Sequence, residues 1–536
     1  MSFVPDTQNK EFQDALNLIQ YTRQSVFLTG KAGTGKSTFL KYICANTKKK
    51  HVVLAPTGIA AINAGGSTLH SFFKLPFYPL LPDDPNFSLQ RGRIHEFFKY
   101  TKPHRKLLEE LELVIIDEIS MVRADIIDAV DRILRVYSRN LREPFGGKQI
   151  LLVGDVFQLE PVVKGDEREI LNRFYPTPYF FSARVFGQID LVSIELQKVY
   201  RQTDSKFIHV LDHIRNNTVG STELQLLNTR YGTQIEQSEA DMYITLATRR
   251  DNVDYINDKK LAELPGDPVT FYGEIMGDFP ESSLPTSQEL VLKPGAQIIF
   301  IKNDFDRRWV NGTIGVISGF DPIEETLYVI TDDGKECDVK RESWRNIRYK
   351  YNEEKKQIEE EELGIFTQYP VRLAWAITVH KSQGLTFSRV VIDFTGGVFA
   401  GGQAYVALSR CTSLEGIQLK KPISRADVFV RPEIVSFSER FNNRTAIDRA
   451  LKQAQADVQY VAAAKAFDKG DFGTFLDEFF KAIHSRYDIE KPNVQRLIRR
   501  KLNIINRLKE ENRALKQAAL EKEKALVKYA REYILM

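Results

Sequence analysis

A glycine-rich stretch near the start of the chain has the residue types needed to hold phosphate. The pattern G-x-x-x-x-G-K-S is complete over residues 30–37, between an apolar strand-like run and a helix-compatible segment. Glycines let the backbone curl until successive N–H groups face one anion, while the positive end of the next helix points at it. Lys36 would neutralise the outer phosphates, and Ser37 would hold Mg²⁺. The residues expected to contact the nucleotide here are Gly30, Ala32, Gly33, Thr34, Gly35, Lys36, Ser37 and Thr38.

A pair of carboxylates complements this loop. Residues 113–116 form a fully apolar run, typical of a strand buried on both faces, and the run leads directly into Asp117 and Glu118. Asp117 would bind Mg²⁺, and Glu118 would orient an attacking water. Together with the phosphate-binding loop, these acids predict a nucleotide hydrolase.

Further polar side chains lie beside other expected strands and helices. Gln158 follows the apolar run 149–153 and could sense the terminal phosphate, and Gln13, in a segment with helical spacing, could read adenine through its amide. After the strand expected at 51–55, small residues and hydroxyls would let a phosphate backbone approach, and His70 and Phe72 could stack on it or hydrogen-bond to it. The positions expected to face nucleic acid in this segment are Pro56, Thr57, Gly58, His70, Ser71 and Phe72.

The composition indicates a globular chain of several domains. With 536 residues, the chain exceeds the size of one hydrophobic core, and its apolar and charged fractions are ordinary. No apolar run approaches the roughly 20 residues of a membrane span, and the first residues lack a secretory signal. We therefore expect an intracellular protein, and the absence of a transit segment and the compact length favour a bacterial or phage cytoplasm, with the bacterial cytoplasm preferred.

The cysteines and the distribution of charge indicate the cellular compartment and the kinds of binding site that the protein can have. The three isolated cysteines fit a reducing compartment and exclude a metal site made of paired cysteines. The net charge is only +4, yet residues 490–536 carry thirteen Lys or Arg and six Glu, a local balance of +7. Basic charge is thus concentrated in the tail, and the remaining body can still carry a locally basic groove.

The order of these motifs resembles the first motor domain of a superfamily-one helicase. Five longer sequence segments resemble those of the petite-integration-frequency (Pif) helicases, a RecD-related group. The segments are APTGIAAINAGGSTLHSFF, DEISMV, GDVFQLEPV, YFFSA and VHKSQGLTF, and the resemblance covers about residues 5–430. It implies an α/β fold with two RecA-like domains, and ATP- and Mg²⁺-dependent movement 5′ to 3′ on single-stranded DNA. It also implies unwinding of forked duplexes, RNA–DNA hybrids or G-quadruplexes, in replication, repair, recombination or telomere-type maintenance.

The resemblance assigns roles to residues in the second half of the chain. It puts Arg201 where an arginine reaches across to the nucleotide, and Arg410 in the place of a second arginine finger. Gln383 and Gly384 would face the nucleotide. The residues that would face the DNA strand are Thr378, His380 and Lys381. The expected catalytic set is Lys36, Glu118, Gln158, Arg201 and Arg410.

Five segments are expected along the chain. They are a RecA-like motor domain at 1–190, a second RecA-like domain at 191–289 and 365–435, an inserted small β-barrel at 290–364, and a helical extension at 436–536. Four short strands between residues 296 and 340, separated by Gly, Asn and Asp turns, predict the barrel. The resemblance matches it to the Src-homology-like insert of the family. The acidic run 353–362 is expected to be a solvated connector.

Beyond residue 436 the resemblance ends. Helical spacing with a break at Gly470 predicts a short helical bundle, and Pro492 opens a long helix with apolar residues every seven positions. Lys501 and Lys522 interrupt this stripe, which indicates either a weak coiled coil or an amphipathic helix docked on the body. Self-association or a partner helix is slightly favoured over docking, and DNA contact by the basic face is a third alternative.

The hypothesis from the sequence is that ATP binds between the two motor domains. Closure would bring the arginines to the nucleotide, so hydrolysis would be tied to a shift of grip on DNA. Two rivals are a DNA-binding scaffold that uses nucleotide only as a switch and a translocase that moves without separating strands. Glu118 and the two arginines argue against the scaffold. The sequence does not separate the translocase from a helicase, because the unwinding wedge is a matter of surface shape.

Overall fold

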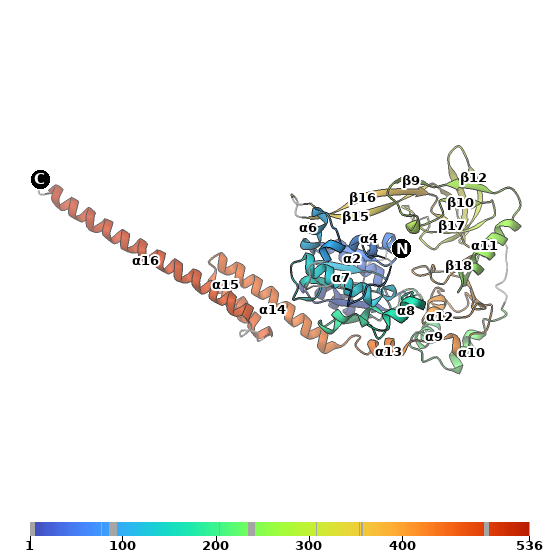
Figure 1. The fold of residues 1–536 in the computed structure, drawn as a ribbon, viewed down its shortest axis with the longest axis horizontal. Helices are drawn as coiled ribbons and strands as arrows, with labels where there is room; N and C mark the ends of the chain where they lie inside the picture. The colour runs from blue at the N-terminus through green and yellow to red at the C-terminus, as the bar shows by residue number, and fades with distance from the viewer. Residues whose placement is uncertain are drawn as a thin grey trace. The chain divides into compact units, whose positions relative to one another are not determined.

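The computed structural model consists of two compact units, Met1–Ile447 and Asp448–Met536 (Figure 1). It describes residues 6–76, 78–84, 94–163, 165–202, 204–233, 242–306, 308–352, 354, 357–486 and 492–534. Among the helices of these residues, none combines the length and apolar character that a membrane span requires.

The first unit begins with a six-stranded parallel sheet in the order β3-β2-β4-β5-β1-β6. Its strands are β1 (Val26–Gly30), β2 (His51–Ala55), β3 (Ser67–Thr68), β4 (Leu113–Ile116), β5 (Gln149–Val153) and β6 (Val192–Leu196). The apolar runs predicted at 51–55, 113–116 and 149–153 are therefore confirmed as strands. Because nearly every residue of β1, β2, β4 and β5 is buried, polar groups are confined to the strand ends.

Helices and 3-10 turns connect these strands. The helices are α1 (Lys10–Tyr21), α2 (Lys36–Asn46), α3 (Gly58–Ala64), α4 (Leu69–Phe73), α5 (Ile94–Phe97), α6 (Lys102–Glu110), α7 (Ala124–Tyr137) and α8 (Gly165–Leu171). The 3-10 turns are η2 (Ile119–Met121), η3 (Pro144–Gly147), η4 (Phe180–Ser182) and η5 (Arg184–Gly187). Side-chain caps mark the starts of α3 and α4, where the hydroxyls of Thr57 and Thr68 accept hydrogen bonds from backbone N–H groups.

A second parallel sheet follows, in the order β18-β7-β19-β20. Its strands are β7 (Ile244–Ala247), β18 (Ala376–Thr378), β19 (Val390–Asp393) and β20 (Ile417–Leu419). The helices of this part are α9 (Ser205–Arg215), α10 (Ser221–Asn228), α11 (Arg250–Glu263), α12 (Gln403–Leu408) and α13 (Pro432–Ser438), with a 3-10 turn η7 (Arg425–Asp427). The fold thus contains the two sheets expected of paired RecA-like domains. The predicted boundary at residue 190 is wrong, since β6 pairs with β1 in the first sheet.

A β-rich region interrupts the second sheet between β7 and β18. Five antiparallel strands lie in the order β14-β13-β12-β11-β17, and two shorter strands pair as β10-β8. These strands are β8 (Val269–Tyr272), β10 (Glu289–Leu292), β11 (Gln297–Phe300), β12 (Ile314–Asp321), β13 (Thr326–Thr331), β14 (Glu336–Val339) and β17 (Val371–Leu373), with a 3-10 turn η6 (Glu281–Ser283). The four predicted strands are β11 to β14, with a common apolar core. The limits of the insert at 290–364 stay a prediction.

A long hairpin leaves this region and reaches the first sheet. Strand β16 (Gln357–Gln368) pairs with β15 (Glu342–Asn352) on one side and with β9 (Glu274–Gly277) on the other, and the β15–β16 hairpin extends toward α6 (Figure 1). Tyr349 on β15 lies in the core of the first motor domain, and its hydroxyl accepts a hydrogen bond from Val53 N–H at 3.4 Å. The hairpin therefore ties the insert to the domain that carries the phosphate-binding loop.

The prediction that the acidic run 353–362 is a solvated connector is wrong for residues 357–362, because these residues lie in β16. Two adjacent glutamates there pair across the hairpin with arginines on β15, at 2.7 Å for Arg345–Glu362 and 2.6 Å for Arg348–Glu361. Cross-strand ion pairs let an acidic sequence form a strand. Residues 353, 355 and 356 lie outside the described residues.

The second unit is helical, as predicted. It contains most of α14 (Arg444–Asp468), all of α15 (Phe472–Arg486) and α16 (Pro492–Ile534). Gly470, with φ of +78°, separates the first two helices. Lys501 on α16 pairs with Asp468, and its ammonium lies 4.7 Å from the ring centre of Phe467. This pairing explains why a lysine interrupts the apolar stripe at that position.

Candidate nucleotide-binding site

The glycine-rich stretch forms a turn between β1 and α2. Gly33 and Gly35 have φ of +82° and +90°, which side chains rarely tolerate, and Gly35 is the N-cap of α2. A Cβ at Gly33 would lie 2.4 Å from the Cβ of Arg201. The loop thus needs glycine both for its curvature and for the close approach of the segment that carries Arg201.

A cavity of about 430 Å³ opens beside this turn. Its lining combines residues before and after the β-rich insert. The lining residues are Ala32, Gly33, Thr34, Gly35, Lys36, Ser37, Thr38, Asp117, Glu118, Gly154, Gln158, Arg201, Gly384, Thr386 and Arg410. The structure therefore brings together every predicted catalytic residue and both predicted metal ligands. Thr386, which the motifs do not single out, joins them.

Lys36 lies at the base of the cavity. Its Nζ donates to the carbonyls of Gly30 at 2.6 Å and Lys31 at 3.0 Å. Burial lowers the pKa of Lys36, while Asp155 and Glu118 act in the opposite direction. An ammonium held by neutral carbonyls beside a cavity can exchange those bonds for phosphate oxygens.

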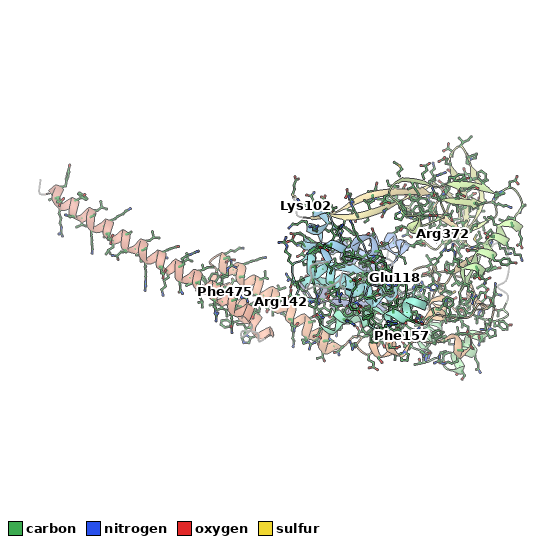
Figure 2. The ribbon with its side chains drawn as sticks, in the orientation of Figure 1. Lys102, Glu118, Arg142, Phe157, Arg372 and Phe475 are labelled. Carbon is green, nitrogen blue, oxygen red and sulfur yellow. The ribbon has the colours of Figure 1, made fainter. Side chains whose placement is uncertain are left out.

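The two carboxylates lie on one wall, and Figure 2 labels Glu118. Glu118 has φ of +49°, a backbone conformation that costs energy in a non-glycine residue and is found at functional sites. Its N–H donates to Asp117 Oδ1 at 2.9 Å. Burial raises the pKa of Asp117 to about 7, helped by the charge of Glu118, and burial raises the pKa of Glu118 as well. Two crowded carboxylates facing a cavity are the donor set that a hard divalent cation prefers.

Two arginines line the same cavity as these acids. The Arg410 side chain is only 1% exposed, and its guanidinium donates to the carbonyls of Val406 at 3.0 Å and Ser382 at 3.3 Å. Burial lowers its pKa to about 9, with a further contribution from Arg201. Arg201 donates to the carbonyl of Ser409 at 3.3 Å. Buried cations held by neutral carbonyls favour an anion in the space they line.

Several contacts that the motifs did not predict hold the two sheets together around the loop. Tyr405 on α12 accepts a hydrogen bond from Ala32 N–H at 2.9 Å. Asp212 on α9 pairs with Lys31 at 2.6 Å. These residues lack a local sequence signal, because their partners lie far away in the chain.

Arg215, also on α9, forms a second buried connection. It pairs with Asp155 at 3.0 Å and with Glu195 at 2.9 Å, and its guanidinium lies 4.3 Å from the ring centre of Phe157. Figure 2 labels Phe157. Since Asp155 follows β5 directly, this arginine fixes the strand end that leads to Gln158. Helix α9 therefore reaches both the phosphate-binding loop and the β5 end.

Other predicted nucleotide contacts lie outside the lining. Gln383 Nε2 donates to Gln158 Oε1 at 3.5 Å, so it touches the cavity through another side chain. Gly30 does not line the cavity, but its carbonyl accepts a hydrogen bond from Lys36 Nζ. Gln13 is exposed and donates to the Thr7 carbonyl at 2.8 Å, so its contact with adenine stays a prediction.

The predicted DNA contacts after β2 divide into surface and core. Pro56, Thr57, His70 and Ser71 are partly or fully exposed. Phe72, on α4, is 3% exposed and packs in the core, so the prediction that it stacks on DNA is wrong. Leu69, Phe72 and Phe73 have the i, i+3, i+4 spacing of the buried face of a helix, which the prediction did not take into account.

Gly58 lies close to another part of the protein, Ser283, and not beside open space that DNA could enter. A Cβ at Gly58 would lie 2.6 Å from Ser283 Oγ in the β-rich insert. The expected contact between this glycine and a phosphate backbone is therefore not supported, because Ser283 occupies that space.

A basic cluster surrounds the end of β18. Lys381 is exposed by surface area, and partial desolvation together with the charges of Arg372 and Arg250 lowers its pKa. Arg372 on β17, labelled in Figure 2, has a pKa lowered to about 10 by burial. Thr378 Oγ1 accepts from Lys381 N–H at 3.2 Å, and His380 stacks on the exposed Phe399. This cluster suits a phosphate backbone, and sequence reasoning missed Arg372.

The fold and cavity define a P-loop nucleotide-binding motor with two RecA-like domains. The sequence model of PIF1-like helicases matches residues 4–225. The ATP-dependent DNA helicase Pif1 of Bdellovibrio bacteriovorus is 31% identical over 442 residues, which cover 80% of this chain and 91% of that protein. The chain therefore belongs to the PIF1-like helicase family.

Solved structures agree with this membership. Bacteroides sp Pif1 in complex with ADP-AlF4 is 42% identical, with a TM-score of 0.73 over 80% of this chain and 96% of that one. Bacteroides Pif1 bound to ssDNA gives a TM-score of 0.58 at the same identity, over 82% and 97%. Vertebrate relatives are longer: the match to ATP-dependent DNA helicase PIF1 of Danio rerio, at 34% identity, spans 77% of this chain but 60% of that protein.

Proposed function

We propose that the chain is an ATP-dependent DNA helicase that moves 5′ to 3′ along single-stranded DNA and unwinds duplex. The observation that carries this proposal is that Lys36, Glu118 and Arg410 line one cavity although they come from separate domains. The bacterial relatives are named ATP-dependent DNA helicases, and Bacteroides Pif1 binds ADP-AlF4 in one crystal and ssDNA in another.

ATP with Mg²⁺ is the proposed cofactor. Ser37 and Asp117 would hold the cation, which would neutralise phosphate charge. The raised pKa values of Asp117 and Glu118 fit this role, because a bound cation would favour the ionised form of both groups.

Each cavity side chain has a role that follows from its charge. Lys36 would leave the carbonyls of Gly30 and Lys31 for the outer phosphates. Glu118 would orient the attacking water and accept its proton. Arg201 and Arg410 would stabilise the negative charge that develops on the transferring phosphoryl group.

The geometry also suggests how hydrolysis is tied to movement. The bond between Gln158 and Gln383 joins the β5 end of the first domain to the segment that leads from His380 and Lys381 into the cavity. A change at the terminal phosphate would therefore alter the relative position of the two DNA-facing strand ends, after β2 and after β18. We expect closure and opening of this connection to shift the grip on DNA.

A polarity assay tests the proposal. Purified protein is mixed with ATP, Mg²⁺ and one duplex that carries either a 5′ or a 3′ single-stranded tail, and strand release is measured. We expect release only from the 5′-tailed duplex, and none with Glu118→Gln. Equal release from both tails would contradict the polarity. ATP-driven displacement of a protein block without strand release would instead favour the translocase.

The preferred DNA structure is a narrower proposal. Forked duplex is favoured, because one Bacteroides Pif1 structure describes unwinding at forked dsDNA. G-quadruplexes and RNA–DNA hybrids are further candidates in replication, repair or recombination. We also propose that the protein acts in a bacterial cytoplasm, on the strength of its bacterial relatives.

The C-terminal helix suggests a protein partner. On α16, Leu508, Leu515 and Leu526 are 49%, 68% and 69% exposed. Ile505 and Leu526 belong to one series of seven-residue spacing, and Leu508 and Leu515 belong to a second series three residues further along. We propose that this stripe binds a second copy of the chain in a parallel coiled coil. Asn512 occupies one a position, where a buried asparagine specifies a register.

Charge complementarity supports the same partner. In a parallel pair, Glu511 of one copy would face Lys516 of the other. Sedimentation velocity of the full chain tests the proposal: we expect a dimer, and a monomer for Leu515→Glu, with Ala514→Glu as the control that adds the same charge off the stripe. A wild-type monomer at tens of micromolar would overturn it.

A further inference from the structure

A cluster of two histidines and one glutamate lies on the second motor domain, outside the nucleotide cavity. His209 and His213 are four residues apart on α9, and Glu223 lies in the first turn of α10. One ligand atom from each residue lies within 4.8 Å of the other two. The His209 and His213 rings are 4.3 Å apart between centres. We propose that these three side chains form a zinc-binding site.

The hydrogen bonds of His213 prepare one nitrogen for a metal. His213 Nδ1 lies 3.2 Å from the carbonyl oxygen of Thr218. The Thr218 hydroxyl lies 3.1 Å from the same nitrogen and can itself donate to the His213 carbonyl oxygen at 3.5 Å. With the proton on Nδ1, the carbonyl and the hydroxyl of Thr218 both accept from it, and the Nε2 lone pair is free. A backbone carbonyl that fixes the tautomer in this way is the usual outer partner of a metal-binding histidine.

Glu223 is held in a similar way. Its Oε2 accepts a hydrogen bond from Gly220 N–H at 2.9 Å, which anchors the carboxylate before α10 begins. The other oxygen, Oε1, remains available as a ligand.

The donor set selects the metal. Two imidazole nitrogens and one carboxylate oxygen suit Zn²⁺ better than Mg²⁺ or Ca²⁺, which prefer oxygen. With bonds of about 2.1 Å, tetrahedral zinc holds ligand atoms roughly 3.4 Å apart. The 4.8 Å span therefore needs a small inward rotation, which the exposed His209 and half-buried partners allow. A water would complete the coordination.

The position of the site gives it a consequence for the motor. Helix α9 carries Asp212 to Lys31 in the phosphate-binding loop, and Arg215 to Asp155 at the end of β5. Zinc would join the last turn of this helix to α10 through Glu223. Bound metal would thus stabilise the helix that connects the second domain to the nucleotide site.

Metal titration of the full chain tests the site. Tag-free protein, freed of trace metal and kept in excess Mg²⁺, is titrated with Zn²⁺ in a calorimeter, and Co²⁺ absorption reports the geometry. We expect one Zn²⁺ per chain and a tetrahedral Co²⁺ spectrum. His209→Ala and His213→Ala should each weaken Zn²⁺ binding at least tenfold. His484→Ala, in the C-terminal unit, is the matched control and should bind normally.

A second variant separates ligation from folding. Glu223→Gln keeps an oxygen for the Gly220 N–H but weakens the metal bond, so we expect reduced Zn²⁺ affinity with an unchanged melting temperature in zinc-free buffer. Zn²⁺ should raise the melting temperature of the wild type and leave His209→Ala/His213→Ala unchanged. Equal affinity and stoichiometry in that double variant and the wild type would overturn the proposal. Loss of affinity shared by His484→Ala would also contradict it.

Discussion

The nucleotide cavity and the basic cluster around β18 both place cations where an anion is expected, but they differ in burial. Arg410 is 1% exposed, and backbone carbonyls accept hydrogen bonds from its guanidinium, whereas the Lys381 side chain is exposed on the surface of the protein. Charges in a low-dielectric site act strongly and are fixed before the ligand arrives, while exposed charges are screened by water and salt. The comparison teaches that a substitution in the cavity should abolish chemistry, and one in the cluster should only weaken a grip.

The largest expected effect is at Arg410. Arg410→Ala should lower ATP turnover about 10³-fold or more, because a buried charge that acts on the transition state is lost. ATP binding should be largely retained, since Lys36 and the loop remain. Steady-state hydrolysis and binding of a fluorescent nucleotide measure the two separately. The exposed Arg142, labelled in Figure 2, supplies the control Arg142→Ala. Normal turnover in Arg410→Ala would remove this arginine from the mechanism.

The basic cluster should respond more gently. Arg372→Ala and Lys381→Ala should each weaken single-stranded DNA binding by a similar factor for every DNA sequence. Each substitution should also reduce the slope of log affinity against log salt concentration by about one, because one phosphate contact is lost. Hydrolysis without DNA should stay within about twofold of wild type. Fluorescence anisotropy at several salt concentrations measures both quantities. An unchanged salt dependence would place the DNA elsewhere.

The raised pKa of Asp117 predicts how Mg²⁺ binding depends on pH. With a pKa of about 7 in the folded chain, Mg²⁺ must displace a proton at lower pH, so its affinity should fall about tenfold per pH unit below 7. Isothermal titration in buffers of different ionisation enthalpy measures the released proton. Affinity independent of pH from 5 to 8 would contradict the raised pKa.

The same shift sets a stability trend in the absence of cations. The folded state holds the proton of Asp117 more tightly than the unfolded chain, in which the pKa of this carboxyl group is 3.8. Asp117 therefore makes stability decrease as pH rises from about 4 to about 7. Comparing the unfolding of wild type and Asp117→Asn across this window isolates the contribution.

The smallest effect is expected on the hairpin surface. Arg348→Ala breaks the pair with Glu361, but both side chains are more than a third exposed, so the free energy of unfolding should fall by less than about 1 kcal/mol. Tyr349→Ala, one residue along, should cost several times more because the ring is buried in the motor core. Denaturant unfolding of the two variants makes the comparison, and equal costs would contradict it.

Sequence patterns predicted the parts of the site whose signal is local. Gly33, Lys36 and Asp117 lie in continuous motifs next to apolar strands, and the structure places them in one cavity. Tyr405, Asp212 and Arg215 were missed, because their roles depend on partners in distant segments. Phe72 was misassigned, because its place with Leu69 and Phe73 on the buried face of the short helix α4 was not recognised.

The fold shows the same division. The parallel strands and the long helix α16 follow from apolar periodicity, which is a local signal. The hairpin β15–β16 was missed because its acidic strand depends on arginines of the opposite strand. The membership of β6 in the first sheet likewise depends on pairing with β1, far away in the chain.

The most direct test of the account is ATP hydrolysis measured while single-stranded DNA is titrated into the protein. If the cavity and the strand ends after β2 and β18 work as one motor, hydrolysis should rise with DNA to a plateau, and Arg372→Ala/Lys381→Ala should shift the midpoint to higher DNA concentration. Hydrolysis that ignores DNA at every concentration would contradict the motor and leave the nucleotide as a switch.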